Sequence, residues 1–275
     1  MISNAQAVIL GLIQGLTEFV PVSSTAHLRI LPAFFGWPDP GAAYSAVIQL
    51  GTLLALVIYF RSDLYDFFGS AIRGVFAGKP FENKPARMAW FMALGTVPVS
   101  VFGLLFSSFI TGEARSLYVI SGSLISLAIF LLFADRFSSK KREIEHVTWL
   151  DFLLIGVAQS LALIPGASRS GTTLTMGLLL GFTRESSMRI SFLLSIPAIA
   201  LSGVYELVKE REELAQLGFS GLFIGTAVSA IVGYLTIAGL LRYLRTHTVL
   251  IFSLYRVFIG LVILYLVISG ILLPL

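Results

Sequence analysis

The chain has 275 residues, of which 56% are hydrophobic and only 12% are charged, and its mean hydropathy is +0.90. Because soluble domains carry about 25% charged residues, this composition excludes an ordinary soluble domain and predicts an integral membrane protein. The formal net charge of +4 does not indicate a nucleic-acid partner, since Lys and Arg also gather in the cytoplasmic loops of membrane proteins. The chain contains no Cys, which excludes disulfides, thiolate metal sites and a cysteine nucleophile.

The first apolar segment is too short for a membrane-spanning helix. Residues 5–19 are apolar but end near Glu18, and Pro21 and the polar run Ser23-Ser24-Thr25 precede a second short apolar run that ends at Phe35. Apolar runs of about 10–14 residues suit re-entrant segments better than spans, and irregular backbone at membrane depth needs protein or water around it. We therefore expect a helix–loop–helix hairpin that enters and leaves on one side. No cleavable signal peptide is expected, because no basic segment precedes the apolar residues.

Three long apolar stretches and a polar linker follow this hairpin, and the same pattern then begins again. The long stretches cover residues 44–60, 88–110 and 117–134, and the linker covers 136–147. The second copy begins with two short apolar segments, 149–164 and 174–182, on either side of the polar loop 165–173. Its long stretches cover residues 187–207, 219–241 and 249–273. Each long stretch has about the length that crosses a bilayer as a helix. The order predicts an all-α polytopic membrane protein with two re-entrant hairpins.

The two hairpins are also related in sequence, at an offset of 145 residues. The matching pairs are Ser3 and Thr148, Gln6 and Asp151, Gly11 and Gly156, Gln14 and Gln159, Ser23 and Ser168, and Thr25 and Ser170. Each copy opens with the pattern of a capping box. We expect one membrane domain, residues 1–275, with repeat one at 1–135, a cytoplasmic linker at 136–147 and repeat two at 148–275. Because each repeat contains an odd number of spans, the second should have inverted topology, an architecture that binds solutes near the membrane midplane.

The distribution of basic residues predicts the orientation. One side of the expected arrangement receives Arg61, Arg73, Lys79, Lys84, Arg87, Arg136, Lys140, Lys141, Arg142, Arg242 and Arg245, and the other receives Arg115, Lys209 and Arg211. Because basic residues favour the cytoplasmic side, we expect residues 61–87 and 136–147 in the cytoplasm. Both termini then lie on the outer face, and the active site opens to that side. Eight full spans remain an alternative, although they separate these charges less cleanly.

Glu18 is an acidic residue deep inside an apolar segment, which is costly and points to function. Gln14 lies one helical turn earlier on the same face. The alternative is a purely structural hydrogen bond between helices.

Arg169 is the corresponding cation, because it lies in the polar loop at the middle of the second hairpin. Its planar fork of donors suits phosphate oxygens, and Ser168, Ser170, Thr172 and Thr173 surround it with hydroxyl groups. The alternative is a structural salt bridge to Glu18. The returning helices begin near Ser24 and Ser170, and such helix N-termini attract anions. Ser and Thr at these positions, including Ser23 and Thr25, are equally good helix caps.

His27 is the one His in an apolar segment, three residues after Ser24. Three scattered His and no Cys make a zinc site improbable. A hard cation such as Mg²⁺, or another divalent cation such as Ca²⁺, held by a carboxylate, an amide oxygen and a substrate phosphate is the more natural expectation.

Two long segments resemble a known family. The segment from Gln14 to His27, QGLTEFVPVSSTAH, is similar to the (E/Q)-x-x-x-E segment of the undecaprenyl-diphosphate phosphatase family of the bacitracin-resistance type, and the segment from Pro165 to Thr173, PGASRSGTT, is similar to that family's P-G-x-S-R-S-x-x-T segment. Val47-Ile48-Gln49-Leu50-Gly51 and Tyr255-Arg256 also match, and the likeness covers essentially the whole chain. Gln14 stands where many members have Glu, and Ala26 stands where Gly is expected.

The resemblance implies metal-dependent hydrolysis of undecaprenyl diphosphate to the monophosphate in the bacterial inner membrane, with Glu18, Ser24, His27 and Arg169 at positions that the family uses. We assign Ser24 as the nucleophile and His27 as its base, while the rival scheme makes His27 the nucleophile. Glu18 would hold Mg²⁺ with help from Gln14. The diphosphate would bind to Arg169, Ser168, Ser170, Thr173, Ser23 and Thr25.

A transporter or flippase for an anionic polyprenyl lipid is the alternative function, because inverted repeats with broken helices also serve alternating access. The sequence leaves the oligomeric state open, and a homodimer is compatible with it.

Overall fold

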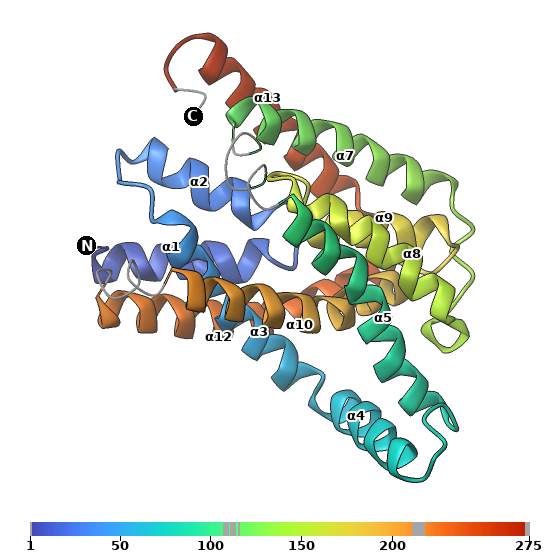
Figure 1. The fold of residues 1–275 in the computed structure, drawn as a ribbon. Helices are drawn as coiled ribbons and strands as arrows, with labels where there is room; N and C mark the ends of the chain where they lie inside the picture. Colours follow the sequence, from blue (N-terminus) through green and yellow to red (C-terminus); the bar gives the residue numbers. More distant parts are fainter. Residues whose placement is uncertain (1, 107–109, 111–113, 115, 211–217, 273–275) are drawn as a thin grey trace.

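The computed structural model describes residues 2–106, 110, 114, 116–210 and 218–272, and these are helical almost throughout (Figure 1). The helices are α1 (Asn4–Thr17), α2 (Ser24–Phe34), α3 (Gly41–Tyr59), α4 (Arg61–Phe76), α5 (Lys84–Leu105), α7 (Leu117–Phe137), η2 (Ile144–His146), α8 (Trp149–Ser160), η3 (Leu161–Leu163), α9 (Arg169–Leu179), α10 (Arg184–Lys209), α12 (Phe219–Leu244) and α13 (Leu250–Ile268). Within the described ranges no strand is formed, and one isolated bridge joins Arg142 to Phe182. The predicted all-α fold is confirmed.

Five of the six predicted spans correspond to helices that are long and apolar enough to cross a membrane. These helices are α5, α7, α10, α12 and α13. A sixth span is counted among the described residues only when α3 and α4 are taken together across a bend of 78°. The chain is therefore a multi-pass membrane protein. The ends of the predicted stretches 88–110 and 249–273 include residues 107–109 and 273, which lie outside the described residues.

Helix α4 occupies most of residues 61–87, the segment that the sequence predicts to be cytoplasmic. Its sequence mixes charged residues, such as Asp63 and Arg73, with exposed apolar residues, such as Tyr65 and Phe76. The charges end the apolar run that marks a span, but they do not end the helix, because an amphipathic helix needs only one continuous apolar face. Figure 1 shows α4 projecting from the rest of the molecule.

The four hairpin helices are too short to cross a bilayer. Helices α1, α2, α8 and α9 have 14, 11, 12 and 11 residues, which corresponds to about 16–21 Å at 1.5 Å per residue, against a hydrocarbon core of about 30 Å. Helix α1 contacts α2, and α8 contacts α9. Both predicted capping boxes are present, since Ser3 pairs with Gln6 and Thr148 with Asp151.

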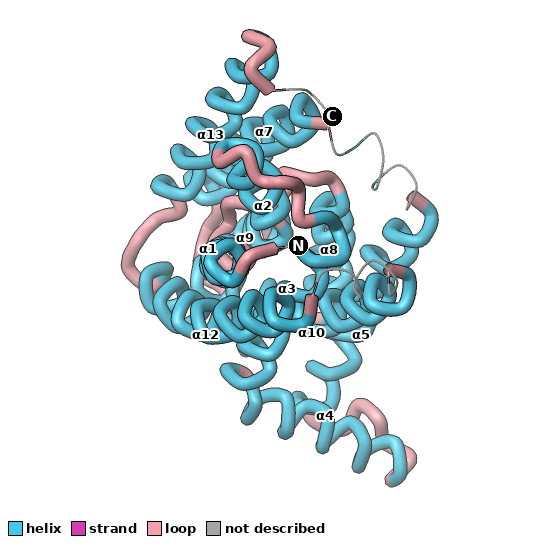
Figure 2. Tube along the Cα trace, turned by 90° about the vertical axis from the view of Figure 1, so that its left-hand side faces the viewer, coloured by secondary structure: helices cyan, strands magenta, loops and turns pink. Residues whose placement is uncertain are grey.

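Each hairpin packs against a long helix from the other half of the chain. Helix α1 lies along α12, and α8 lies along α5. Figure 2 shows these hairpin helices in the middle of the molecule. Helices α12, α10 and α5 lie along one side of them, and α7 and α13 lie on the other. Glycine permits the close approach in both places. A Cβ at Gly11 would lie 2.6 Å from the carbonyl oxygen of Gly225, and one at Gly156 would collide with the carbonyl oxygen of Gly95. Small residues serve this purpose in membrane helix pairs. The inverted relation of the two repeats stays a prediction.

The largest apolar cluster joins the two halves around a set of buried aromatic rings. Its rings include Phe19, Phe60 and Phe192, with Phe192 edge-on to Phe19 at 5.3 Å between ring centroids. Phe19 directly follows Glu18, so packing of this ring anchors the loop that holds the carboxylate. The core therefore fixes one wall of the candidate site.

Ion pairs gather where α10 begins. They join Asp135 to Arg184, Arg142 to Asp151, Asp63 to Arg189 and Glu185 to Arg245. The linker is docked here rather than extended, because the backbone N–H groups of Lys141 and Arg142 donate to the carbonyl oxygen of Gly181, at 2.9 Å each. Arg136, assigned to the linker by the sequence, is instead part of α7, since the helix continues to Phe137. We call this region the ion-pair end.

Candidate active site

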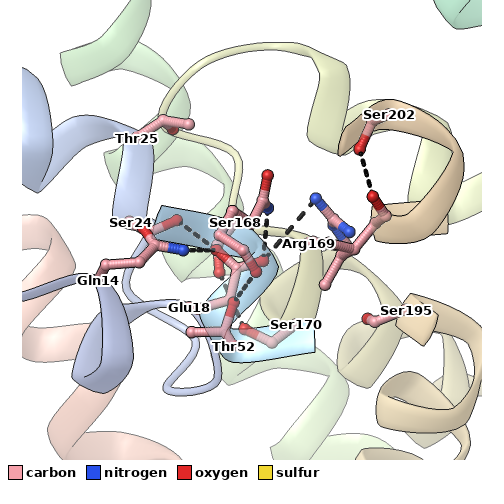
Figure 3. A network of polar contacts seen from close by, with 12 residues as sticks. Gln14, Glu18, Ser24, Thr25, Thr52, Ser168, Arg169, Ser170, Ser195 and Ser202 are labelled. Atoms are coloured by element: carbon pink, nitrogen blue, oxygen red, sulfur yellow. Dashed lines mark hydrogen bonds and ion pairs between the residues drawn. The ribbon is translucent and has the colours of Figure 1, made fainter. Parts of the chain in front are cut away.

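The carboxylate of Glu18 is the centre of a polar network between the hairpins (Figure 3). Glu18 follows α1 directly and is 8% exposed. Its Oε2 accepts hydrogen bonds from Nε2 of Gln14 at 3.0 Å and from Oγ of Ser24 at 2.7 Å. Its Oε1 accepts from Nε2 of Gln49 in α3 at 2.8 Å. A carboxylate held by this many donors is satisfied despite its burial.

Arg169 brings the second hairpin to the same carboxylate. Its Nη2 lies 3.8 Å from Oε1 of Glu18, and its Nη1 is buried without a partner among the described residues. The two hairpins also touch directly, because Oγ of Ser170 donates to the carbonyl oxygen of Val20 at 3.3 Å. The two hairpin loops therefore meet, and Arg169 faces Glu18.

The two loops share an unusual backbone conformation at matching positions. Ser23 and Ser168 cap α2 and α9 with φ of 75° and 68°, in the left-handed region that ordinary residues rarely adopt. Such strain costs about 1–3 kcal/mol and tends to gather at functional sites. Ser24 and Arg169 are the first residues of the helices that follow, and both contact Glu18. Two helix N-termini, with their unpaired N–H groups and partial positive charge, therefore lie beside this network.

His27 makes contacts that the sequence did not predict. Its Nδ1 lies 2.7 Å from the carbonyl oxygen of Ser23, and its Nε2 lies 2.7 Å from the hydroxyl of Tyr255 in α13. The two rings are stacked, with centroids 5.5 Å apart. Neither ring nitrogen contacts Ser24 in this structure. The hydroxyl of Ser24 instead donates to Glu18.

The remaining predicted phosphate ligands differ in their access to the site. Thr173 is fully buried, and its hydroxyl contacts the carbonyl oxygen of Arg169 at 2.7 Å and Oγ of Ser191 at 2.6 Å, so it faces α10. Ser168 accepts from the N–H of Gly171 at 3.2 Å and acts as the helix cap. Ser170 contacts Ser168 and Val20, Ser23 contacts Thr25, and Thr25 itself is exposed. None of these five hydroxyl groups forms a hydrogen bond with Glu18 in the described part of the chain.

Three residues at or beside the site were matched to the family from the sequence but given no role there: Gln49, Tyr255 and Arg256. Gln49 and Tyr255 contact Glu18 and His27 as described. Arg256 is 0% exposed and contacts the loop that precedes Arg169. A signal was available, because Arg256 is a cation inside the apolar stretch 249–273, the same anomaly that identified Arg169.

The contacts of Glu18 and Gln14 do not match a metal site formed by the protein alone. Both carboxylate oxygens of Glu18 accept hydrogen bonds, and Gln14 turns its amide nitrogen, not its oxygen, toward them. No group of three or more His, Asp or Glu that could hold a metal occurs in the part of the chain that the structure describes. Glu18 is surrounded by donors, whereas a cation requires acceptors. We therefore derive no step of the reaction through a metal.

Comparison with known proteins decides the family. The family model described as bacitracin resistance protein BacA matches residues 7–262. The chain belongs to this family. The resemblance seen in the two sequence segments is thereby confirmed.

Similar proteins cover almost the whole chain. The undecaprenyl-diphosphatase of Myxococcus xanthus strain DK1622 is 54% identical over 272 residues, which cover 99% of this chain and 92% of that protein. The undecaprenyl-diphosphatase of Chloroherpeton thalassium is 50% identical over 265 residues, with 93% of each chain covered. That of Chlorobium phaeovibrioides is 48% identical over 279 residues, with 98% and 99% covered. This BacA-family chain is thus matched along its length to proteins named for a single reaction.

Proposed function

We propose that the chain hydrolyses undecaprenyl diphosphate to undecaprenyl phosphate and inorganic phosphate. One observation carries the proposal: a hydroxyl at a helix N-terminus, that of Ser24, lies 2.7 Å from the buried carboxylate of Glu18, beside the guanidinium of Arg169. A nucleophile within hydrogen-bond distance of a base is the arrangement that activates a weak hydroxyl. The names of the relatives point to the same reaction. They offer no support for the transporter alternative.

In the proposed first step, Oγ of Ser24 attacks the terminal phosphorus. Glu18 takes the hydroxyl proton, the Oγ–P bond forms, and the bond from that phosphorus to the bridging oxygen breaks. Undecaprenyl phosphate leaves with the bridging oxygen. Glu18 passes the proton to the bridging oxygen of the departing phosphate. In the second step, water attacks the phosphoserine and Glu18 takes a proton from the water. The Oγ–P bond breaks, and Glu18 returns this proton to Oγ of Ser24 as inorganic phosphate leaves.

This assignment revises the predicted role of His27 as the base for Ser24. Glu18 holds that position in the structure, and His27 faces Tyr255 and the carbonyl oxygen of Ser23. Because Nδ1 meets a carbonyl oxygen, it carries the proton in the neutral ring, and Nε2 is the acceptor. We assign His27 and Tyr255 as a second proton-bearing pair near the phosphates. The rival scheme, in which Nε2 of His27 attacks phosphorus, requires the Tyr255 hydroxyl to move away first.

Arg169 has the geometry for stabilising charge on the transferred group. Phosphoryl transfer spreads negative charge over the equatorial oxygens, and its catalysis rests on positioning and electrostatic stabilisation. Nη1 of Arg169 is a buried donor without a hydrogen-bond partner among the described residues, and leaving such a group unpaired is costly. A phosphate oxygen would satisfy it. The first N–H groups of α2 and α9 would supply further donors.

We propose that a divalent cation such as Mg²⁺ arrives with the diphosphate. Mg²⁺ in proteins is commonly held by one or two carboxylates together with substrate phosphates, and Glu18 is the one carboxylate in this network. Because both carboxylate oxygens of Glu18 accept hydrogen bonds in the structure, a donor would have to turn away for Glu18 to bind the cation, and phosphate oxygens would provide most of the ligands.

We place the protein in the bacterial inner membrane, with both termini on the outer face and the site open to that side. The ion pairs support this orientation, because basic residues predicted to be cytoplasmic, Arg142 and Arg245 among them, lie together at the ion-pair end. A homodimer stays a proposal without a specific contact to support it.

The deciding experiment is rapid-quench trapping of a phosphoenzyme during turnover of radiolabelled polyprenyl diphosphate by the purified full chain. We expect an acid-stable adduct that is absent in Ser24→Ala and still formed by the control Ser139→Ala, at an exposed position. An acid-labile, base-stable adduct would mean phosphohistidine and would remove Ser24 as the nucleophile. Absence of any hydrolysis by the wild-type protein, with and without Mg²⁺, would remove the proposed function itself.

A further inference from the structure

Arg256 in α13 is a fully buried cation that forms no ion pair within the described part of the chain. It is the largest side chain among the fully buried residues. Its Nη2 donates to backbone carbonyl oxygens, and its Nε and Nη1 are buried with no hydrogen-bond partner among the residues that the structure describes. No carboxylate of the described residues forms an ion pair with it. An unpaired cation inside a membrane protein is expensive and calls for a functional explanation.

The carbonyl groups that Arg256 binds belong to the loop before Arg169. Its Nη2 lies 3.2 Å from the carbonyl oxygen of Gly166 and 2.9 Å from that of Ala167. The carbonyl oxygen of Pro165 accepts from Oγ of Ser123 in α7 at 2.7 Å. Three consecutive carbonyl oxygens thus point at α7 and α13. Because C=O and the following N–H point in opposite directions across a trans peptide, the N–H groups of Gly166 and Ser168 point away from α7 and α13.

The guanidinium of Arg256 also lies against the N-terminal turn of α9. A Cβ added to Gly171 would be 2.7 Å from Nη1 of Arg256. This turn already carries the partial positive charge of a helix N-terminus, and Arg169 is its first residue. A cation placed here is repelled in the empty protein. An anion bound at the same helix end would offset this repulsion.

We propose that Arg256 is a positioning residue for the diphosphate. It holds the loop of Pro165, Gly166 and Ala167 so that no carbonyl oxygen of this segment faces the phosphates, and it adds buried positive charge behind the first turn of α9. Arg169 is then presented from a fixed loop. This inference rests on the proposed function, because it assumes that the anion at α9 is the diphosphate of the substrate.

A purely structural role for Arg256 makes a different prediction. If Arg256 only stabilises the packing of α13 against the loop before Arg169, its replacement lowers thermal stability and leaves the affinity of the folded protein for diphosphate unchanged. If it serves the anion, the affinity falls even in the folded fraction. Lys keeps the charge but lacks the planar fork of donors, and Met loses both. The expected order of affinity is therefore wild type, then Arg256→Lys, then Arg256→Met.

The test measures binding of methylenediphosphonate, a diphosphate analogue with an uncleavable carbon bridge, to the purified full chain by calorimetry. We expect affinity to fall about tenfold in Arg256→Lys, because the loop before Arg169 is no longer held by the planar fork, and further in Arg256→Met, because the buried charge is also lost; a tenfold change corresponds to about 1.4 kcal/mol. With polyprenyl diphosphate as substrate, KM should rise more than kcat falls. Arg142→Met is the matched control, since it breaks an ion pair at the ion-pair end and should lower the Tm without changing the affinity.

Each outcome decides between the alternatives. Wild-type affinity in Arg256→Lys and Arg256→Met would overturn the inference and leave the proposed function standing. Weakened binding in these variants, combined with no hydrolysis by the wild type, would support the inference and overturn the proposed function. A wild-type chain that binds no analogue would overturn both. If neither Arg256 variant folds, Ser123→Ala takes their place, and we expect it to weaken binding several-fold; unchanged binding would contradict the inference.

Discussion

The hydroxyl of Tyr255 lies 2.7 Å from Nε2 of His27, although 228 residues separate them in the sequence. The carbonyl oxygen of Ser23 lies 2.7 Å from the other ring nitrogen, so both ring nitrogens are engaged. The ring is therefore held in one orientation by its own hairpin and by α13. This contact joins the first hairpin to the last described helix.

Replacement of Tyr255 by Phe should lower kcat about threefold to tenfold, since a single hydrogen bond of about 1 kcal/mol is removed. The aromatic stacking on His27 is kept, so the Tm should change little. Steady-state kinetics in detergent with polyprenyl diphosphate measure the effect. A rise in kcat would contradict our scheme, because it would mean that the hydroxyl blocks a nucleophilic Nε2 of His27.

Replacement of Glu18 by Gln should lower kcat about 10²–10⁴-fold, the contribution that general base catalysis typically makes. The change keeps the size of the side chain but removes the acceptor of the Ser24 proton. Glu82→Gln is the matched control, because Glu82 is exposed and pairs only with Lys79 among the described residues. Activity of Glu18→Gln within tenfold of wild type would show that another group accepts the proton.

Replacement of Arg169 by Lys should lower kcat about a hundredfold while the protein still folds. Lys retains the charge opposite Glu18 but cannot present two parallel donors to a phosphoryl group. Arg242→Lys, at an exposed position near the end of α12, should behave as wild type. If Arg169→Lys turns over at the wild-type rate, Arg169 serves only as a charge partner for Glu18.

Replacement of Gly156 by Ala should destabilise the contact between α8 and α5. The added methyl group would collide with the carbonyl oxygen of Gly95, and overpacking of this kind costs about 1–3 kcal/mol. The Tm in detergent should fall by several degrees. Gly239→Ala in α12 is the control, because a Cβ there meets no atom within 4 Å. Equal Tm values for the two variants would contradict the packing described for α8.

A single cysteine in place of Ser139 tests the orientation. The chain has no Cys, and Ser139 is exposed after the end of α7. A membrane-impermeant thiol reagent should label this site only after the cells are permeabilised. Labelling in intact cells would place the ion-pair end outside and invert our orientation.

The sequence alone was sufficient for the membrane class, the five long helices, the two short hairpins and the family. These features follow from local properties of the sequence: the length of an apolar run, the spacing of a capping box, and the residue types in the two long motifs at Gln14–His27 and Pro165–Thr173. Glu18 and Arg169 were also found in this way, because a charge inside an apolar segment is visible without any knowledge of its partner. The fact that the two meet could be inferred, since each is costly to leave unpaired.

The partners of the other site residues depended on the tertiary structure. The spacing of Ser24 and His27 suggested one helical face, but Ser24 is the first residue of α2, and the left-handed backbone of Ser23 precedes it. Its hydroxyl contacts Glu18, in the segment before the helix, while His27 contacts Tyr255. The contacts of Gln49 and Arg256 likewise join helices far apart in the sequence. Spacing rules describe neighbours within one helix, whereas these contacts are set by how the two hairpins and α13 pack together.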